Sequence, residues 1–156
     1  EANMFYPVAD IVWRGEPRGD RYAQVQSMVT EAASRATGTM SEGRPVNVTI
    51  EITRFHCLTE KTRYTVGGTH ALHFRLTVTD AATGMVLEGP RDVIADVKAS
   101  GGAAAIAEEQ AGRTQRVAVV DRLTDVIRRE LSTVVTDPEV VARALMASQT
   151  MPVGTN

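Results

Sequence analysis

Alternating apolar and polar residues between Val46 and Lys98 are the feature that most constrains the fold of this chain. Every second residue is apolar from Val46 to Ile52 and again from Leu72 to Val78, and the residues between them are polar or charged. A period of two is typical of strands in a sheet that has one buried face and one solvated face. We therefore predict two long antiparallel strands whose apolar residues lie on the same side of the sheet.

A third strand is predicted to return along the second one. Residues 80–84 form a short turn, whose glycine is free to adopt a positive φ. Residues 85–97 supply the returning strand, and Gly89-Pro90 interrupts it, which favours an edge position or a bulge because proline has no N–H to donate. In the first strand the alternation slips after Arg54, which predicts a bulge or a strand end near Thr53.

Two amphipathic helices flank this block of strands. The first is predicted to begin after Asp20, a favourable N-cap residue, and to end near Thr37, with Gly38 as its C′ residue. The second is predicted over residues 114–134. Their apolar stripes comprise Tyr22, Val25, Met28, Val29, Ala32, Ala33 and Ala36 in the first, and Val119, Val120, Leu123, Val126, Ile127 and Leu131 in the second.

Three shorter segments complete the predicted order of strand, helix, three strands, helix and short helix. They are a strand over residues 8–13, one or two helical turns up to residue 111, and a short helix over residues 137–148. A single sheet covered by helices on one face buries both apolar stripes. We therefore predict an α+β fold: a two-layer sandwich with a mainly antiparallel sheet and two long helices on one face. We expect one domain over residues 1–148 and a flexible tail over residues 149–156.

Composition excludes several classes of protein. The net charge of −2 gives no reason to expect nucleic-acid binding. No stretch approaches the roughly 20 consecutive apolar residues of a membrane-spanning helix. The single cysteine, Cys57, excludes an internal disulfide, and we expect it to be a small apolar residue on a strand.

Neither a metal site nor a catalytic motif is predicted. His70 and His73 are three residues apart, and such residues face opposite sides of a strand, whereas a zinc site needs three or four converging ligands. We therefore expect surface histidines and no metal. No nucleophile elbow is present, and the glycine pairs at 67–68 and 101–102 lack the lysine of a phosphate-binding loop. We expect no catalytic residue, no cofactor and no enzymatic activity.

The segment from Thr59 to Gly68 is the first candidate for partner binding. Ten residues are long for a hairpin connection, and this one contains Lys61, Arg63 and Tyr64. This combination of charged, aromatic and β-branched residues is suited to a partner contact or to an ordered flap. The alternative is a twisted extension of the hairpin, with its two glycines as a bulge.

The segment from Trp13 to Asp20 is the second candidate. The only tryptophan stands beside Arg14, Glu16 and Arg18, and tryptophan and arginine are enriched at the centres of protein interfaces. The alternative is a tryptophan that plugs the edge of the core.

Three stretches have distinctive amino-acid sequences: Trp-Arg-Gly-Glu-Pro-Arg-Gly-Asp-Arg-Tyr (residues 13–22), Leu-Thr-Glu-Lys-Thr-Arg-Tyr-Thr-Val-Gly-Gly (residues 58–68) and Gly-Pro-Arg (residues 89–91). Together they resemble a family of small alphaproteobacterial lipoproteins of unknown function, over roughly residues 8–134. The resemblance implies a periplasmic protein anchored to a membrane by a lipidated cysteine that precedes Glu1. The order of elements is also similar to that of periplasmic lipoprotein modules of the curli-secretion and cell-wall-synthase-activator type. Those modules bind other proteins or self-assemble.

From these observations we expect a non-enzymatic envelope module. In the leading hypothesis it contacts an envelope protein, or copies of itself, through the edge of the sheet and residues 59–68. Alanine at Arg63 and Tyr64 is then expected to weaken partner binding with little change in melting temperature. In the alternative hypothesis it is a small-ligand carrier, because alanine-rich helix faces leave room for a cavity between the helices and the sheet.

Overall fold

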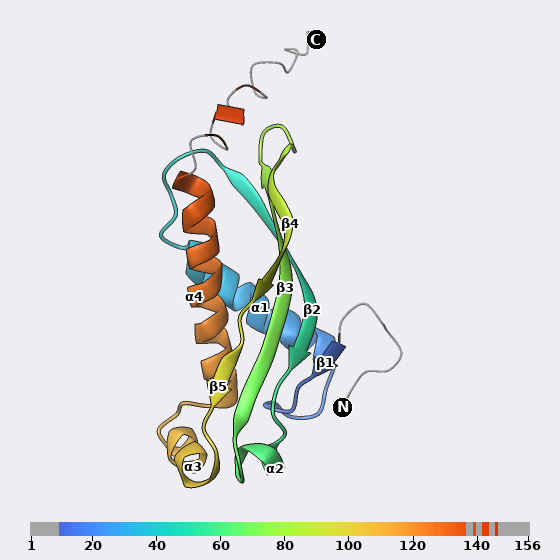
Figure 1. Cartoon of the computed structure of the whole chain (residues 1–156), viewed down its shortest axis with the longest axis vertical. Helices are drawn as coiled ribbons and strands as arrows, with labels where there is room; N and C mark the ends of the chain where they lie inside the picture. The colour runs from blue at the N-terminus through green and yellow to red at the C-terminus, as the bar shows by residue number, and fades with distance from the viewer. Residues whose placement is uncertain (1–9, 137–138, 140–141, 144–145, 147–156) are drawn as a thin grey trace.

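A five-stranded sheet forms one layer of the molecule, and two long helices form the other (Figure 1). The computed structural model describes residues 10–136, 139, 142–143 and 146. The strands are β1 (Asp10–Val12), β2 (Val46–His56), β3 (Gly68–Asp80), β4 (Val86–Ile94) and β5 (Val97–Ala99). The helices are α1 (Arg21–Thr37), α2 (Glu60–Arg63), α3 (Gly102–Gln110) and α4 (Gln115–Thr136). The predicted α+β sandwich is therefore confirmed.

The sheet is mainly antiparallel, with strand order β1-β2-β3-β4. β2 and β3 pair along most of their length, and Val48 lies opposite Val78. Their register shifts between Ile52 and Arg54, which confirms the predicted bulge at Thr53. β1 pairs with the last three residues of β2 in parallel, and β5 pairs with the start of β3.

The returning strand differs in one respect from its prediction. β4 runs without a break through the cis peptide Gly89-Pro90, and the register of β3 and β4 shifts between Leu76 and Val78. The strand ends at Ile94, and β5 is a separate element rather than its continuation. Proline thus lies beside an irregularity on an edge strand. No strand pairs with the outer side of β4 in the sheet described, so the missing N–H removes no hydrogen bond on that side. The turn before β4 contains Gly84 with φ 71°, as predicted.

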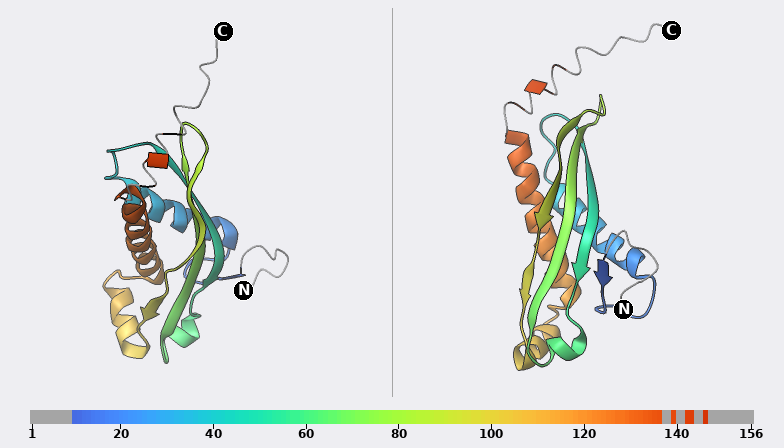
Figure 2. Two further views of the ribbon diagram at one scale, coloured as in Figure 1. Left: turned by 45° about the horizontal axis from the view of Figure 1, so that its top comes forward. Right: turned by 45° about the vertical axis from the view of Figure 1, so that its right-hand side comes forward.

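Both long helices begin and end near their predicted limits. Asp20 caps α1 by accepting a hydrogen bond from the backbone N–H of Ala23 at 3.2 Å. Gly38 follows α1 with φ −59°, so it does not adopt the left-handed conformation of a C′ glycine. α4 carries the predicted apolar stripe, and all six of its residues are buried. Figures 1 and 2 show α1 and α4 crossing on the same side of the sheet.

The core lies between this helix layer and the inner face of the sheet. β3 supplies its centre, because its inward residues are almost completely buried while β2 supplies half-buried ones. The members from β3 are Leu72, Phe74, Leu76 and Val78. Trp13 and Phe55 close one end of the core at an interplanar angle of 84°, with ring centroids 5.9 Å apart.

The expected helix over residues 137–148 and the tail over 149–156 lie largely outside the described residues. The same holds for the first residues of the predicted strand over 8–13. Among the described residues, no helix is both long enough and apolar enough to cross a membrane.

Candidate functional site

A cleft of about 1010 Å³ opens between α1, the segment that follows it and the inner face of β2. It extends back to the core, where Ile127 and Leu131 of α4 form its far wall. Its size is at the upper end of the range of roughly 300–1,000 Å³ that is typical of small-molecule sites. It is much larger than a second hollow of about 270 Å³, which is lined by Arg63, His70 and Arg122.

Helix α1 forms one wall of the cleft along almost its whole length. Residues from Tyr22 to Thr37 line it at helical spacing, which corresponds to a groove about 22 Å long. Toward the C-terminal end this wall consists of small side chains, such as Ala33 and Ser34. Small side chains on the helix leave space that larger ones would fill with packed atoms.

Strand β2 forms the opposite wall. Val46, Val48, Ile50 and Ile52 line the cleft, and each is only half-buried although it lies on the inner face of the sheet. Their neighbours on β3 are fully buried, as Leu76 opposite Ile50 shows. The exposed apolar surface therefore results from the position of the helices and not from the pattern of the strand.

The lining of the cleft is almost free of charge. Only Glu42 and Arg44 of its lining residues are charged. Arg44 is already engaged, because its guanidinium Nε donates to a carboxylate oxygen of the buried Asp80. This bond holds the pKa of Asp80 at about 2, below its usual value, and N–H groups of Ala82 and Thr83 assist at 2.9 and 2.8 Å. Among the residues that the structure describes, the cleft thus offers mainly apolar contacts, and its one cationic side chain already binds a carboxylate.

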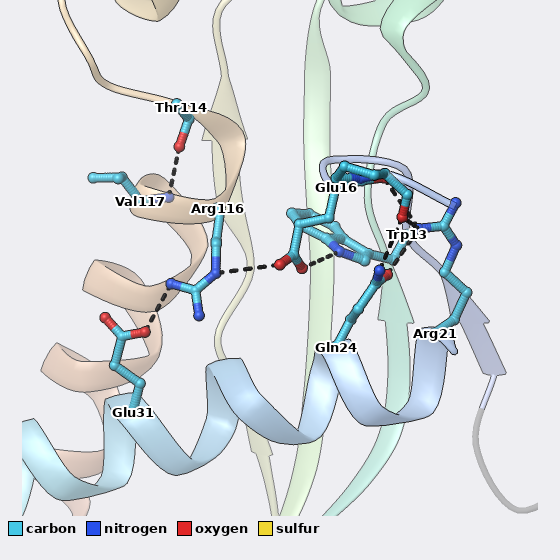
Figure 3. Close-up of polar contacts among 9 residues, drawn as sticks. Trp13, Glu16, Arg21, Gln24, Glu31, Thr114, Arg116 and Val117 are labelled. Carbon is cyan, nitrogen blue, oxygen red and sulfur yellow. Dashed lines mark hydrogen bonds and ion pairs between the residues drawn. The ribbon is translucent and has the colours of Figure 1, made fainter. Parts of the chain in front are cut away.

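The predicted partner-binding segment from Trp13 to Asp20 is built around a buried side chain. Trp13 is 0% exposed, and its indole Nε1 donates to Glu16 at 2.9 Å (Figure 3). Glu16 also faces Arg116 of α4 at 3.7 Å, and Arg116 pairs with Glu31 of α1 at 2.7 Å. A Cβ on Gly15 would come within 2.3 Å of the indole ring, so the loop needs glycine there. Trp13 therefore plugs the core edge, which was the alternative interpretation, while Arg14 and Arg18 remain on the exposed surface.

The predicted partner-binding segment from Thr59 to Gly68 contains a short helix and is not an open hairpin loop. Thr59 caps α2, and Arg63 is only 7% exposed because its guanidinium binds Glu109 of α3. A Cβ on Gly101 would lie 2.4 Å from the backbone N of Gly67, so the two connecting segments touch backbone to backbone. Lys61 and Tyr64 stay exposed. The two predicted segments thus lie on different elements, and each has one of its members in the interior.

One of the three histidines departs from the expected surface position. His70 is 2% exposed, and its Nδ1 accepts a hydrogen bond from the backbone N–H of Leu58 at 3.2 Å. Burial, together with the positive charge of Arg63, lowers the pKa of His70 to about 4. His73 points away from the core and lies 3.1 Å from Asp96, so the two rings do face opposite sides of β3. Within the described part of the chain, no group of three or more His, Cys, Asp or Glu side chains could hold a metal ion.

A comparison with protein families places the chain among its relatives. The chain belongs to a family of unknown function, DUF6778, whose match covers residues 1–147. This agrees with the expected membership in a family without an assigned function. No curated protein and no solved structure matches the chain. The family therefore supplies no residue roles, and only the site itself can indicate a function.

Sequence reasoning did not select the residues of the cleft, although it allowed for a cavity between the helices and the sheet. The signal was present in the small residues on the C-terminal half of α1, from Thr30 to Thr37. That signal became specific only when the crossing of α1 over β2 was known.

Proposed function

We propose that this chain is a non-enzymatic binding module of the cell envelope, and that its cleft holds an elongated, uncharged apolar group such as a hydrocarbon chain. The observation that supports this is the long cleft between α1 and β2 with its nearly uncharged lining. Of the two functions expected from the sequence, the cleft favours the ligand carrier.

Size, shape and chemistry of the cleft agree with such a ligand. A groove about 22 Å long is suited to an extended chain rather than to a compact ring system. Burial of apolar surface contributes roughly 25 cal/mol per Å². A ligand that covers the half-exposed side chains of Val48 and Ile50 therefore gains binding free energy from their burial. Among the described lining residues, an anionic headgroup finds little complementary charge, since Arg44 already binds Asp80 through its Nε and the other charged residue is Glu42.

Displacement of an uncharged fluorescent probe tests the proposal. N-phenylnaphthylamine should bind to the purified protein, and hexadecanol should displace it more effectively than hexadecanoate. Ala33→Phe fills the part of the groove where the α1 wall consists of small side chains, so it should weaken probe binding about tenfold.

Ala23→Phe is the matched control, because Ala23 is exposed on the same helix and does not line the cleft. This variant should bind the probe like the unmodified protein. Equal binding by both variants, or no binding by the unmodified protein, would contradict the proposal. Native mass spectrometry of protein purified from its own host provides a second test, in which we expect a retained apolar ligand.

The envelope location rests on the resemblance to lipoproteins. We propose a periplasmic protein with an N-terminal lipid anchor attached ahead of Glu1. Fractionation of cells that express the complete gene, with mass spectrometry of the mature N-terminus, should find a lipidated cysteine. A cytoplasmic product without a lipid would overturn the location but not the ligand.

A further inference from the structure

Part of the edge of β2 has no strand partner within the described residues. One side of β2 pairs with β3 from Val46 to His56. On the other side, the described residues of β1 pair with the last three residues of β2, Arg54 to His56. The stretch from Val46 to Ile52 therefore presents a row of backbone donors and acceptors. It forms the edge of the sheet on the part of β2 that β1 does not cover (Figure 2). Such a row is a template for another strand.

The two edges of the sheet differ in how they are protected. The outer edge, β4, contains Pro90 and the charged residues Glu88, Arg91 and Asp92, and these features discourage pairing. The stretch Val46–Ile52 contains no proline and no lysine, and its single charge is Glu51. One end of this edge already accepts β1 as a partner, so the pairing would continue an existing contact.

We propose that two copies of the chain associate through their β2 strands, antiparallel to each other, about a two-fold axis at Thr49. The bulge at Thr53 limits the regular part of the edge to Val46–Ile52, and Thr49 is its middle residue. An isologous contact of this kind closes on itself and yields a dimer rather than a filament.

The proposed register is complementary in charge and in polarity. It places Asn47 opposite Glu51 of the second copy, so the amide can donate to the carboxylate and no like charges meet. On the inner face it places Val48 opposite Ile50, and Val46 opposite Ile52. These half-buried side chains line the cleft, so the dimer would cover apolar surface that one copy leaves exposed. The inference depends on the edge and holds whether or not the cleft binds a ligand.

Sedimentation velocity over a range of protein concentrations tests the inference. The unmodified chain should be a dimer at high concentration. Thr49→Lys puts two like charges opposite each other at the axis and should weaken association about tenfold. Thr77→Lys is the matched control: Thr77 lies opposite Thr49 on β3, on the same face of the sheet but away from the edge. That variant should associate normally.

Charge complementation makes the test specific for the register. An equimolar mixture of Thr49→Lys and Thr49→Glu should form a heterodimer, because the lysine then meets a glutamate. Thr49→Cys should form a disulfide between copies under mild oxidation, whereas Asp92→Cys on the exposed edge of β4 should not. Burial raises the pKa of the native Cys57 thiol, so Cys57 does not compete.

Two outcomes would overturn the inference. One is an unmodified chain that stays monomeric at every concentration. The other is a dimer that persists in Thr49→Lys and fails to form the Thr49→Cys disulfide. Because probe binding to the cleft is measured separately, either outcome leaves the proposed ligand site standing.

Discussion

The two halves of strand β2 carry similar residues but lie in different surroundings. At its C-terminal end Phe55 is fully buried, where Trp13 packs against it and β1 covers the edge. In its N-terminal half, Val48 and Ile50 face the same helix layer yet remain half-exposed in the cleft. The difference teaches that an apolar strand face becomes either a dry core or a binding surface according to the size of the side chains that face it.

The largest effect is expected at the closed end of the core. Trp13→Ala should lower the free energy of unfolding by about 3–5 kcal/mol, because it leaves a cavity beside Phe55 and removes one of the partners of Glu16. Urea denaturation followed by circular dichroism measures the change. A loss of less than about 1 kcal/mol would show that this end is not the closed region described above.

A pH effect is expected from His70, which is buried on β3 two residues before Leu72, the residue opposite Phe55. Its pKa of about 4 in the folded chain lies below the usual value of 6.5, so the unfolded chain binds the proton first as pH falls. Above pH 6.5 the neutral His70 does not lower the free energy of unfolding. As pH falls from 6.5 toward 4, the free energy of unfolding decreases by about 3 kcal/mol. Unfolding curves of the unmodified chain and His70→Gln across this range should show a flatter pH dependence for the variant. Equal slopes would contradict the buried, neutral histidine.

A smaller effect is expected in the open half of β2. Ile50→Ala should cost about 1–2 kcal/mol, since its side chain is only half-buried. Leu76→Ala is the matched comparison, because Leu76 lies opposite Ile50 and is fully buried, and it should cost about 3 kcal/mol. Denaturation midpoints of the two variants measure the contrast. Equal costs would mean that the cleft is packed in solution.

The smallest effect is expected on the outer surface of α2. Tyr64→Ala should change stability by about 0.5 kcal/mol or less, because Tyr64 is exposed. Arg63→Ala should cost more, since it leaves Glu109 without its partner. Thermal melts of the two single variants separate them. The sequence-based expectation that both alanines leave the melting temperature unchanged would be supported only if Arg63→Ala also melted normally.

Much of the fold could be predicted because its signals are local. The alternation in β2 and β3, the slip at Thr53 and the cap at Asp20 each depend on neighbours within a few residues. The break between β4 and β5 could not be predicted from neighbouring residues in this way. Ala95 donates to Leu72 across the sheet at this break, and such a contact between distant residues leaves no periodic trace.

The candidate sites were harder to predict, because a charged or aromatic residue looks the same in sequence whether it is exposed or buried. Arg63 was expected to contact a partner, but it is buried, because its guanidinium binds Glu109, which lies 46 residues away in the sequence. Trp13 was open to both interpretations until Phe55 and Glu16 were seen around it. Contact of Arg14, Arg18, Lys61 and Tyr64 with a partner protein stays a prediction.

By itself the sequence determined the strands, the long helices and their apolar faces, because hydrophobic periodicity and capping act over one or two turns of the chain. Only the tertiary structure decided where those faces meet and where they leave a gap. That depends on how α1 crosses β2 and on which small side chains meet there, and both follow from packing between residues far apart in the chain.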